Sequence, residues 1–379
     1  MSLRRLIVEA DVLGLNVSEF CRQHGVSTWF FYDLRRRHAR QGDAVLEPQS
    51  RAPHLVANHT SAEVEDVVVR LRKDLVDAGL DAGPGSIWDR LHDELDPPVP
   101  SEATVWRILK RWGLITPQPA KAPRRAARRF VAERANERWQ IDSTHASLAD
   151  GAPVEIINVV DDCSRVNVDS RAVPTCTTAN AFEAICRGAA RWGWPEGVLS
   201  DNGSPFRGLP GDDHPGGLAA TLAALGITTS RSRPYHPQTC GKVERFHQTQ
   251  QRWLAAQPPA ETIAELQTQL DWFRQLYNTA RSHRALGRRT PAEVWHTTPR
   301  SGPAGRPLDT PTQIHHSTVS GGSVWAGRRY RISIGAAHQH KRATLITTGL
   351  ACHVFIDGRL VRHLTINPTR QNQPLGQPQ

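Results

Sequence analysis

The chain has 379 residues, more than one hydrophobic core usually absorbs, so we expect about two to four folding units. Its 47 lysines and arginines outnumber its 37 aspartates and glutamates and give a net charge of +10, which favours a polyanionic partner such as DNA or RNA. Six cysteines without a C-x-x-C pair argue against zinc or a disulfide scaffold. No apolar run approaches the roughly 20 residues of a membrane span, so we predict a soluble, cytosolic protein without a membrane partner.

Residues 1–46 show helical periodicity interrupted by a tight turn. Gly25 ends one predicted helix, and Ser27 is placed to cap the next, TWFFYDLRRRHARQG. The pattern is typical of a helix-turn-helix unit whose second helix packs an aromatic cluster and presents cations to DNA, the predicted contacts being Arg35, Arg36, Arg37 and Arg40. The alternative is a small three-helix unit with a solvated basic face.

Residues 60–117 predict a second all-α unit of three helices. The first carries an apolar stripe that includes Val64, Val68 and Leu75, and prolines separate the two shorter helices that follow. Ser101 is placed to cap the last helix. The spacing favours a second helix-turn-helix-like unit, with the predicted DNA contacts Arg107, Lys110 and Arg111.

Residues 118–137 form a basic linker. Its arginines are spaced so that pairs would share one face if the segment became helical on DNA, and four of them are predicted phosphate contacts: Arg124, Arg125, Arg128 and Arg129. The alternative is a linker whose charges are simply solvated.

From residue 138 the periodicity changes from helical to strand-like, and we predict an α/β domain over residues 138–298. Three strands with short connections precede a helix, a strand, a helix, a strand and a further helix.

Three acidic residues in this domain form a candidate metal site. Asp142 ends the apolar run RWQID, Asp201 follows GVLS, and Glu244 lies in the first turn of the helix that starts GKVERFH. A strand that ends in aspartate can present its carboxylate at the sheet edge, and a neighbouring helix can add a glutamate. Three such oxygen donors suit Mg²⁺ or Mn²⁺ better than zinc.

Four motifs, in this order, resemble those of insertion-sequence transposases with the retroviral-integrase catalytic core, the Asp-Asp-Glu recombinases. They are W-Q-I-D-S-T at 139–144, D-D-C-S-R at 161–165, S-D-N-G-S-P-F at 200–206 and S-R-P-Y-H-P-Q-T-C-G-K-V-E-R-F-H at 232–247. The resemblance implies a ribonuclease-H-like fold with a mixed five-stranded sheet and helices on both faces. In that fold the first and fourth strands are neighbours, so that Asp142, Asp201 and Glu244 converge.

The resemblance also implies the chemistry. Asp142, Asp201 and Glu244 would be catalytic and would hold two Mg²⁺ or Mn²⁺ ions, with Asp142 shared by both. Water would first expose a 3′-hydroxyl at a transposon end, and that hydroxyl would then attack target DNA. The implied partners are terminal inverted repeats and target DNA in a bacterial nucleoid, with at least a dimer pairing two ends. The alternatives are a catalytically silent DNA-binding regulator and a ribonuclease-H-like nuclease.

Residues near the acids are predicted to contact DNA: Asn202, His236, Gln238, Lys242 and Arg245. We expect Asp161 and Asp162 to be structural. The family tends to place a lysine or arginine two helical turns after the glutamate, where this chain has Gln251, and the adjacent Arg252 is a candidate substitute.

Residues 317–367 alternate between apolar and polar types, with glycines at the turns, which predicts a small β-barrel. Its arginines and lysines are candidate DNA contacts, although exposed barrel faces are commonly charged. Residues 368–379 are polar and rich in glutamine and proline, which predicts a disordered tail.

Overall fold

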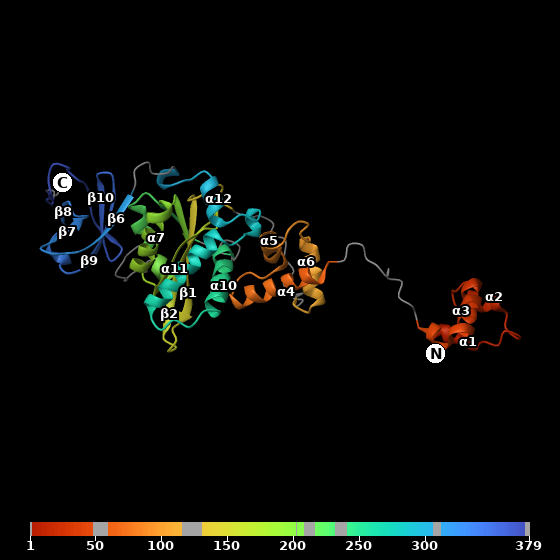
Figure 1. Cartoon of the computed structure of the whole chain (residues 1–379). Coiled ribbons are helices and arrows are strands. Elements are labelled where there is room, and N and C mark those ends of the chain that lie inside the picture. Colours follow the sequence, from red (N-terminus) through yellow and green to blue (C-terminus); the bar gives the residue numbers. More distant parts are fainter. Residues whose placement is uncertain are drawn as a thin grey trace. The chain divides into compact units, whose positions relative to one another are not determined.

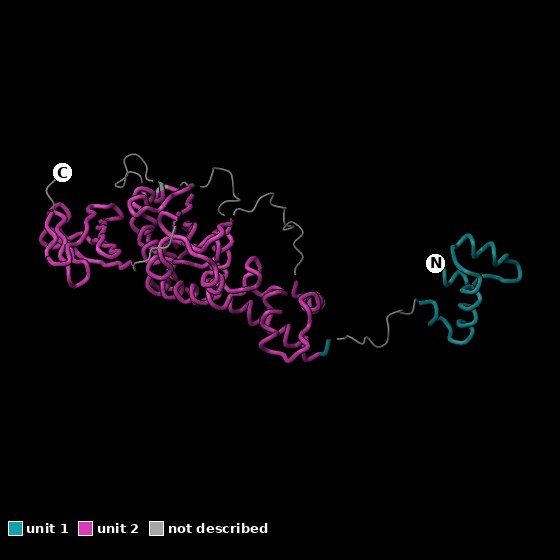
Figure 2. The backbone as a smooth tube through the Cα atoms, turned by 90° about the horizontal axis from the view of Figure 1, so that it is seen from above, with its two compact units in different colours: residues 1–61 teal, residues 62–379 magenta. Residues whose placement is uncertain are grey.

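The computed structural model describes residues 2–47, 60–115, 131–201, 203–207, 217–231, 241–305 and 312–375. The chain divides into two compact units, residues 1–61 and 62–379 (Figure 2). Seven predicted DNA contacts lie outside the described residues: Arg124, Arg125, Arg128, Arg129, Asn202, His236 and Gln238.

The first unit consists of short helices around a small apolar core. Its elements are α1 (Leu3–Glu9), α2 (Val17–Gln23), α3 (Thr28–Gln41) and the 3-10 turn η1 (Gly42–Leu46). Ser27 caps α3 by accepting the N–H of Phe30, which confirms the predicted helix start.

The predicted packing of the aromatic residues of α3 is only partly correct. Phe31 is fully buried, whereas the side chains of Trp29 and Tyr32 are 69% and 55% exposed. Residues 29 and 32 are three positions apart and share one helix face, opposite the face that Phe31 and Leu34 bury. The exposed surface of α3 is therefore aromatic as well as basic.

The second unit begins with three helices, α4 (Ala62–Asp77), α5 (Pro84–Glu94) and α6 (Glu102–Arg111). They surround a core that includes Val68, Leu75 and Ile108. Ser101 accepts the N–H of Thr104 and caps α6. The three predicted helices and the predicted cap are thus confirmed.

A five-stranded mixed sheet follows in the chain. It is built from β1 (Arg138–Ser147), β2 (Pro153–Asp161), β3 (Asn167–Val173), β4 (Gly197–Ser200) and β5 (Thr228–Arg231), in the order β3-β2-β1-β4-β5. The first three strands pair antiparallel, whereas β1 with β4 and β4 with β5 pair parallel. The predicted mixed sheet is confirmed, including the adjacency of the first and fourth strands.

Helices cover both faces of this sheet (Figure 1). On one face Ile141 and Val159 pack in the same core as Phe182, and on the other Val160 packs with Phe246. The alternation of side chains along each strand separates these two cores. The helices and 3-10 turns of the domain are α7 (Thr178–Trp192), α8 (Ser204–Arg207), α9 (Gly217–Ala223), α10 (Gly241–Ala255), α11 (Ile263–Thr279), η3 (Arg284–Leu286), α12 (Pro291–Thr297) and η4 (Pro303–Gly305).

The C-terminal strands form two sheets, and closure of these sheets into the predicted small β-barrel is not shown among the described residues. One has the order β11-β10-β9-β6 and the other the order β12-β8-β7. Side chains from both sheets, among them Val324 and Leu345, meet in one core. Side-chain hydrogen bonds link the edge strands: the Trp325 N–H of β7 donates to the Ser317 hydroxyl of β6, and Arg362 of β11 donates to the Gln373 carbonyl oxygen of β12. Among the described residues no strand of one sheet pairs through its backbone with a strand of the other. Alternation of apolar and polar residues predicts strands but does not specify closure. The elements are β6 (Thr312–Thr318), β7 (Ser323–Ala326), β8 (Tyr330–Ser333), η5 (Ala336–His338), β9 (Arg342–Thr348), β10 (Ala351–Ile356), β11 (Arg359–Thr365) and β12 (Asn372–Gln373).

Part of the predicted disordered tail belongs to this module. The strand β12 pairs in parallel with β8, and Gln373 is buried. Its side-chain amide accepts the N–H of Asn367 and donates to the carbonyl oxygens of Asn367 and Arg370. These backbone partners satisfy the polar side chain, so a polar composition did not exclude burial here.

Two general expectations can be compared with the described residues. The five cysteines that lie among them are free thiols: Cys21, Cys163, Cys176, Cys186 and Cys352. No helix in the described ranges is both long enough and apolar enough to cross a membrane.

Candidate active site

The pairing of β1 with β4 brings Asp142 and Asp201 together. The two strands run parallel with Ile141 opposite Ser200, so the next residues along the chain are the two aspartates. Ile141 faces the core beneath α7, and successive side chains alternate between the faces of a sheet. Both carboxylates therefore lie on the α10 side of the sheet, although 58 positions separate them in the sequence.

The packing of α10 brings Glu244 to the same place. Val243 and Phe246 are buried against the sheet, and His247 Nδ1 lies 3.9 Å from Asp142 Oδ2. Residues 244 and 247 are three positions apart and share one face of α10. Glu244 therefore approaches Asp142 from the helix side.

The electrostatics of Asp142 reflect this convergence. Burial raises the pKa of its carboxyl to about 6, with the charges of Asp201 and Glu244 adding to the effect and a hydrogen bond from the Ser143 N–H opposing it. Burial also lowers the pKa of His247 to about 4, so its imidazole is neutral at neutral pH. The negative charges of Asp201, which follows β4, and Glu244, on α10, thus both raise the pKa of Asp142.

The individual oxygens are turned toward nearby backbone. Asp142 Oδ1 accepts the N–H of Ser143 at 2.9 Å, and Asp201 Oδ1 accepts the N–H of Gly203 at 2.8 Å. Across the described ranges, no three side chains of His, Cys, Asp or Glu are arranged to hold a metal ion. The three carboxylates are close enough for their charges to interact, but their oxygens do not converge on one point.

The donor set nevertheless fits a hard divalent cation. It consists of three carboxylates, one of which has its ionisation opposed by the other two. A cation would offset that repulsion, and carboxylate oxygens are the ligands that Mg²⁺ and Mn²⁺ prefer. Asp142, Asp201 and Glu244 would be its ligands.

The raised pKa of Asp142 predicts a pH-dependent gain in stability when its charge is removed. Its carboxyl has an ordinary pKa of 3.8 and a folded-state pKa of about 6, so the stability that it contributes is complete below pH 3.8 and is lost as the pH rises through about 6. Near neutral pH, in metal-free buffer, we expect Asp142→Asn to raise the free energy of unfolding by about 1–2 kcal/mol, allowing for the partial exposure of the side chain.

Urea unfolding of both proteins in EDTA, at a series of pH values, measures this difference. The two free energies should approach each other in acid, where Asp142 is protonated in both states. A gain of the same size at every pH would show that packing, and not charge, is responsible.

Lys242, predicted to contact phosphate, is instead half-buried in an ion pair. Its ammonium contacts Asp162 Oδ1, and its side chain is 19% exposed. Asp162 also accepts the N–H of Ala132 and the side-chain amide of Gln140. Burial lowers the pKa of Lys242 from its ordinary value. The ion pair supports a structural role for Lys242, and its contact with DNA stays a prediction.

Asp161 is fully buried and structural, as its sequence position suggested. It accepts the N–H groups of Ser164 and Asn136 and the Ser164 hydroxyl. Burial raises its pKa to about 6. These partners bind both carboxylate oxygens to neighbouring groups of the protein.

The residues that follow Glu244 by two turns are also occupied. Gln251 donates to the Thr144 hydroxyl at 2.8 Å, and Arg252 donates to Asp81 Oδ1 at 2.8 Å. The suggested substitution of Arg252 for the family's basic residue is therefore not supported. Arg245 is exposed, and among the described residues it has a hydrogen bond to Gln248 at 3.3 Å, so its DNA contact stays a prediction.

The predicted contacts on α3 differ in their surroundings. Arg35 donates to the carbonyl oxygens of Ile7, Val8 and Ala10, which joins α3 to the end of α1 and gives no support to a DNA contact. Arg36 and Arg37 both pair with one carboxylate, Asp33.

On α6, Arg111 pairs with Glu65, whereas Arg107 and Lys110 are exposed. The predictions for Arg36, Arg37, Arg40, Arg107, Lys110 and Arg111 remain untested by this geometry.

Two features of these sites were not anticipated. His247 lies beside Asp142. Its position three residues after Glu244, on the same helix face, could have indicated this from the sequence. On α6, Trp106 is exposed and Lys110 Nζ lies 5.1 Å from its ring centroid. The spacing of apolar residues predicted the buried face of α6, but it did not predict that Trp106 would be exposed.

The sheet order β3-β2-β1-β4-β5, with helices on both faces, is that of a ribonuclease-H-like core. Comparison with known proteins agrees: residues 132–237 and residues 225–291 each match an integrase core domain. The chain therefore carries an integrase core domain and is distantly related to insertion-element proteins.

Two such relatives are uncharacterized proteins. The chain is 27% identical over 211 residues to a 39.2 kDa protein of insertion element IS476 from Xanthomonas euvesicatoria, a match that covers 54% of this chain and 58% of the relative. It is 29% identical over 160 residues to a 31.7 kDa protein of insertion element IS407 from Burkholderia multivorans, covering 42% and 54%. The chain thus spans less than two thirds of each relative's length.

Similar solved structures include the HTLV-2 integrase catalytic core domain in complex with magnesium in its trimeric form. That match has 17% identity and a TM-score of 0.34, and covers 45% of this chain and all of the other. A chain of the simian T-cell lymphotropic virus intasome in complex with PP2A regulatory subunit B56 gamma matches with 19% identity and a TM-score of 0.38, covering 74% and 95%.

Proposed function

We propose that the protein is a DNA transposase that cleaves phosphodiester bonds at the ends of an insertion element and joins the resulting 3′-hydroxyl to target DNA. The observation that carries the proposal is that β1, β4 and α10 bring Asp142, Asp201 and Glu244 to one side of the sheet, near enough for the charges of Asp201 and Glu244 to act on Asp142. The match to an integrase core domain gives independent support.

Each acid has a distinct place in the proposed site. Asp142, which feels the charges of the other two, would hold both of two Mg²⁺ or Mn²⁺ ions, and Asp201 and Glu244 would each complete one. The ions would supply activation of the attacking oxygen and stabilisation of the leaving 3′-oxygen. The pairing of β1 with β4 positions the two aspartates, the packing of α10 positions the glutamate, and the buried ring of His247 lies beside Asp142.

The test uses the full chain, a duplex with the inverted repeats that flank its reading frame, and a supercoiled plasmid as target. We expect nicking of the repeat ends and their joining to the plasmid with Mg²⁺ or Mn²⁺, and neither in EDTA. Repeat binding without cleavage would favour a DNA-binding regulator. Preferential cleavage of an RNA–DNA hybrid would favour a ribonuclease-H-like nuclease. Because two ends must be paired, we further propose that at least two copies assemble on DNA.

The helical units would bind the ends of the element. On α6 the exposed cations Arg107 and Lys110 flank the exposed Trp106, a surface that combines charge for phosphate with an apolar ring for base edges. Arg111, on the same helix, has its charge paired with Glu65.

This difference between arginines gives a prediction on salt dependence. If Arg107 contacts a phosphate, Arg107→Ala should reduce the slope of log affinity against log salt by about 0.9, since one fewer counterion is released on binding. Arg111→Ala is the matched control and should change the slope less. Fluorescence anisotropy of a labelled repeat duplex at several salt concentrations measures both. Equal slopes for the wild type and Arg107→Ala would remove Arg107 from the interface.

A further inference from the structure

The turn between α4 and α5 lies directly on the backbone of α10, the helix that carries Glu244. Gly79 in this turn has a φ of +68°, and a Cβ atom added to it would lie 2.8 Å from both the carbonyl oxygen of Arg252 and the Cα of Trp253. Two separate reasons therefore require glycine at this position: the left-handed backbone conformation and the close approach of the α10 backbone. The helical unit of residues 62–115 and α10 are in contact without intervening side chains.

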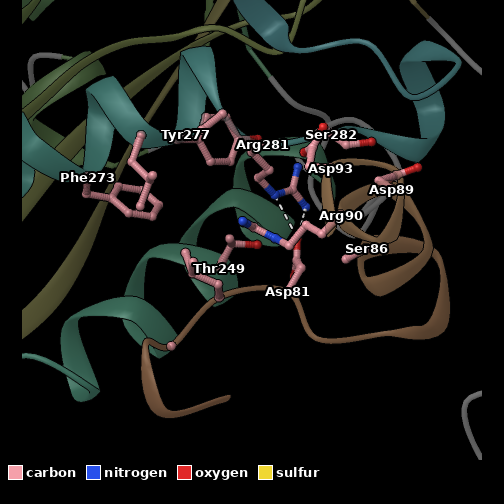
Figure 3. A pocket seen from close by; sticks show the side chains of 14 residues that line it. Asp81, Ser86, Asp89, Arg90, Asp93, Thr249, Phe273, Tyr277, Arg281 and Ser282 are labelled. Carbon is pink, nitrogen blue, oxygen red and sulfur yellow. Dashed lines mark hydrogen bonds and ion pairs between the residues drawn. The ribbon is translucent and has the colours of Figure 1, made fainter. Parts of the chain in front are cut away.

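An ion pair between Asp81 and Arg252 joins the same turn to α10, two residues after Gly79. Asp81 accepts a hydrogen bond from Arg252 at 2.8 Å and another from Arg281 Nε at 2.7 Å. Figure 3 shows Arg281 extending across the cavity wall between Tyr277 and Asp81, and its guanidinium lies 5.0 Å from the Tyr277 ring centroid. Burial opposes the ionisation of Asp81, but the two arginines outweigh it and lower the pKa of Asp81. Loss of this carboxylate would leave two neighbouring cations without their shared partner.

The opposite side of α10 is bound to the sheet. Gln250 is fully buried and exchanges hydrogen bonds with the Asn158 side chain at 2.9 and 3.0 Å, and it donates to the Ser170 hydroxyl. The helix is thus held from both sides. Arg252 follows Glu244 by eight residues, or about 12 Å along the helix axis, so a shift at one is transmitted along a rigid rod to the other.

We propose that Asp81 is a positioning residue for Glu244: by holding Arg252 and Arg281 it fixes α10, and it thereby makes the helical unit of residues 62–115 part of the support of the acidic site. This inference rests on the proposed function, since it assigns Glu244 a catalytic place. It couples the unit proposed to bind DNA to the geometry of the site proposed to cut it.

The experiment compares Asp81→Asn with Asp93→Asn in the full chain. Asp93 lines the same cavity, of about 360 Å³, but has no ion-pair partner among the residues that the structure describes. Hydrogen exchange in α10 is measured first, without metal or DNA. We expect Asp81→Asn to speed exchange there by about ten-fold because the contact that suppresses local opening is lost. Asp81→Glu and Asp93→Asn should both behave as the wild type.

The second measurement is the cleavage of the repeat duplex as a function of Mn²⁺ and DNA concentration. For Asp81→Asn we expect kcat to fall, and the half-saturating Mn²⁺ concentration to rise, by about ten-fold, the usual cost of losing a group that orients a metal ligand. The KM for DNA should stay unchanged, and Asp81→Glu should restore kcat.

Several results would overturn the proposal. They are unchanged exchange in α10, a loss of kcat matched by an equal loss of DNA affinity, and failure of Asp81→Glu to restore kcat. If Asp81→Asn does not fold, Arg252→Gln tests the same contact while leaving Asp81 paired with Arg281. A wild type that never cleaves would refute the proposed function, and the exchange measurement would still decide whether Asp81 holds α10.

Discussion

Substitution of Asp142 or Asp201 by Asn, or of Glu244 by Gln, should lower metal-dependent cleavage of repeat DNA by more than about 100-fold. Loss of a group that only hydrogen-bonds to a metal ligand typically lowers metal affinity or activity by about 10–100-fold. The three carboxylates would contact the ions directly, so a larger loss of activity is expected. The changes remove charge with little change of shape. They also relieve repulsion at Asp142, so lost activity cannot be attributed to unfolding. A nicking assay on labelled duplex measures the loss.

Two controls accompany this prediction. Asp150→Asn alters an exposed acid in the turn between β1 and β2, and cleavage should be unaffected. Binding of the repeat duplex should persist in all variants, because α3 and α6 contain none of the three acids. If the Asp201 variant cleaved at the wild-type rate, the assignment of the site would have to be abandoned.

The largest loss of stability is expected at Trp139. This side chain is fully buried between β1 and α7, and its indole N–H donates to Asn136 Oδ1 at 3.0 Å. A Cβ on Gly188 of α7 would lie 3.4 Å from the indole, which shows how closely helix and strand approach. We expect Trp139→Ala to reduce the free energy of unfolding by about 3–5 kcal/mol, because it removes buried apolar area and leaves a cavity.

Urea unfolding followed by circular dichroism measures this loss. Trp272 on α11 provides the matched control, since its side chain is 60% exposed, and Trp272→Ala should change the free energy by less than about 0.5 kcal/mol. Similar losses for the two variants would mean that the core around β1 is looser than its packing indicates.

The features that could be predicted from the sequence are those that local chemistry determines. Ser27 and Ser101 each precede a run with helical periodicity, and a serine hydroxyl there satisfies an N–H that the helix leaves free. The apolar runs that end at Asp142 and Asp201 indicated where the sheet would present carboxylates. The strand β1 does not end at Asp142, however, but continues to Ser147, whereas Asp201 directly follows the end of β4. Their adjacency came from the resemblance of the motifs, and the pairing of Ile141 with Ser200 confirms it.

What could not be predicted depends on partners distant in the sequence. Lys242 and Asp162 are 80 residues apart in the sequence. The sequence around Glu244 therefore could not show that Lys242 pairs with a buried carboxylate. Arg35 bonds to carbonyl groups more than 20 residues away. A sequence shows that a cation is present, but the fold decides whether its charge reaches solvent.

Gly79 has a practical consequence for engineering. Under the proposed function, a natural way to direct the protein to other DNA ends would be to exchange its helical unit of residues 62–115 for that of another protein. Here a replacement unit with any side chain at position 79 would collide with the backbone of α10. A workable hybrid should therefore keep the native segment of residues 79–82 and import foreign sequence only on the outward face of α6.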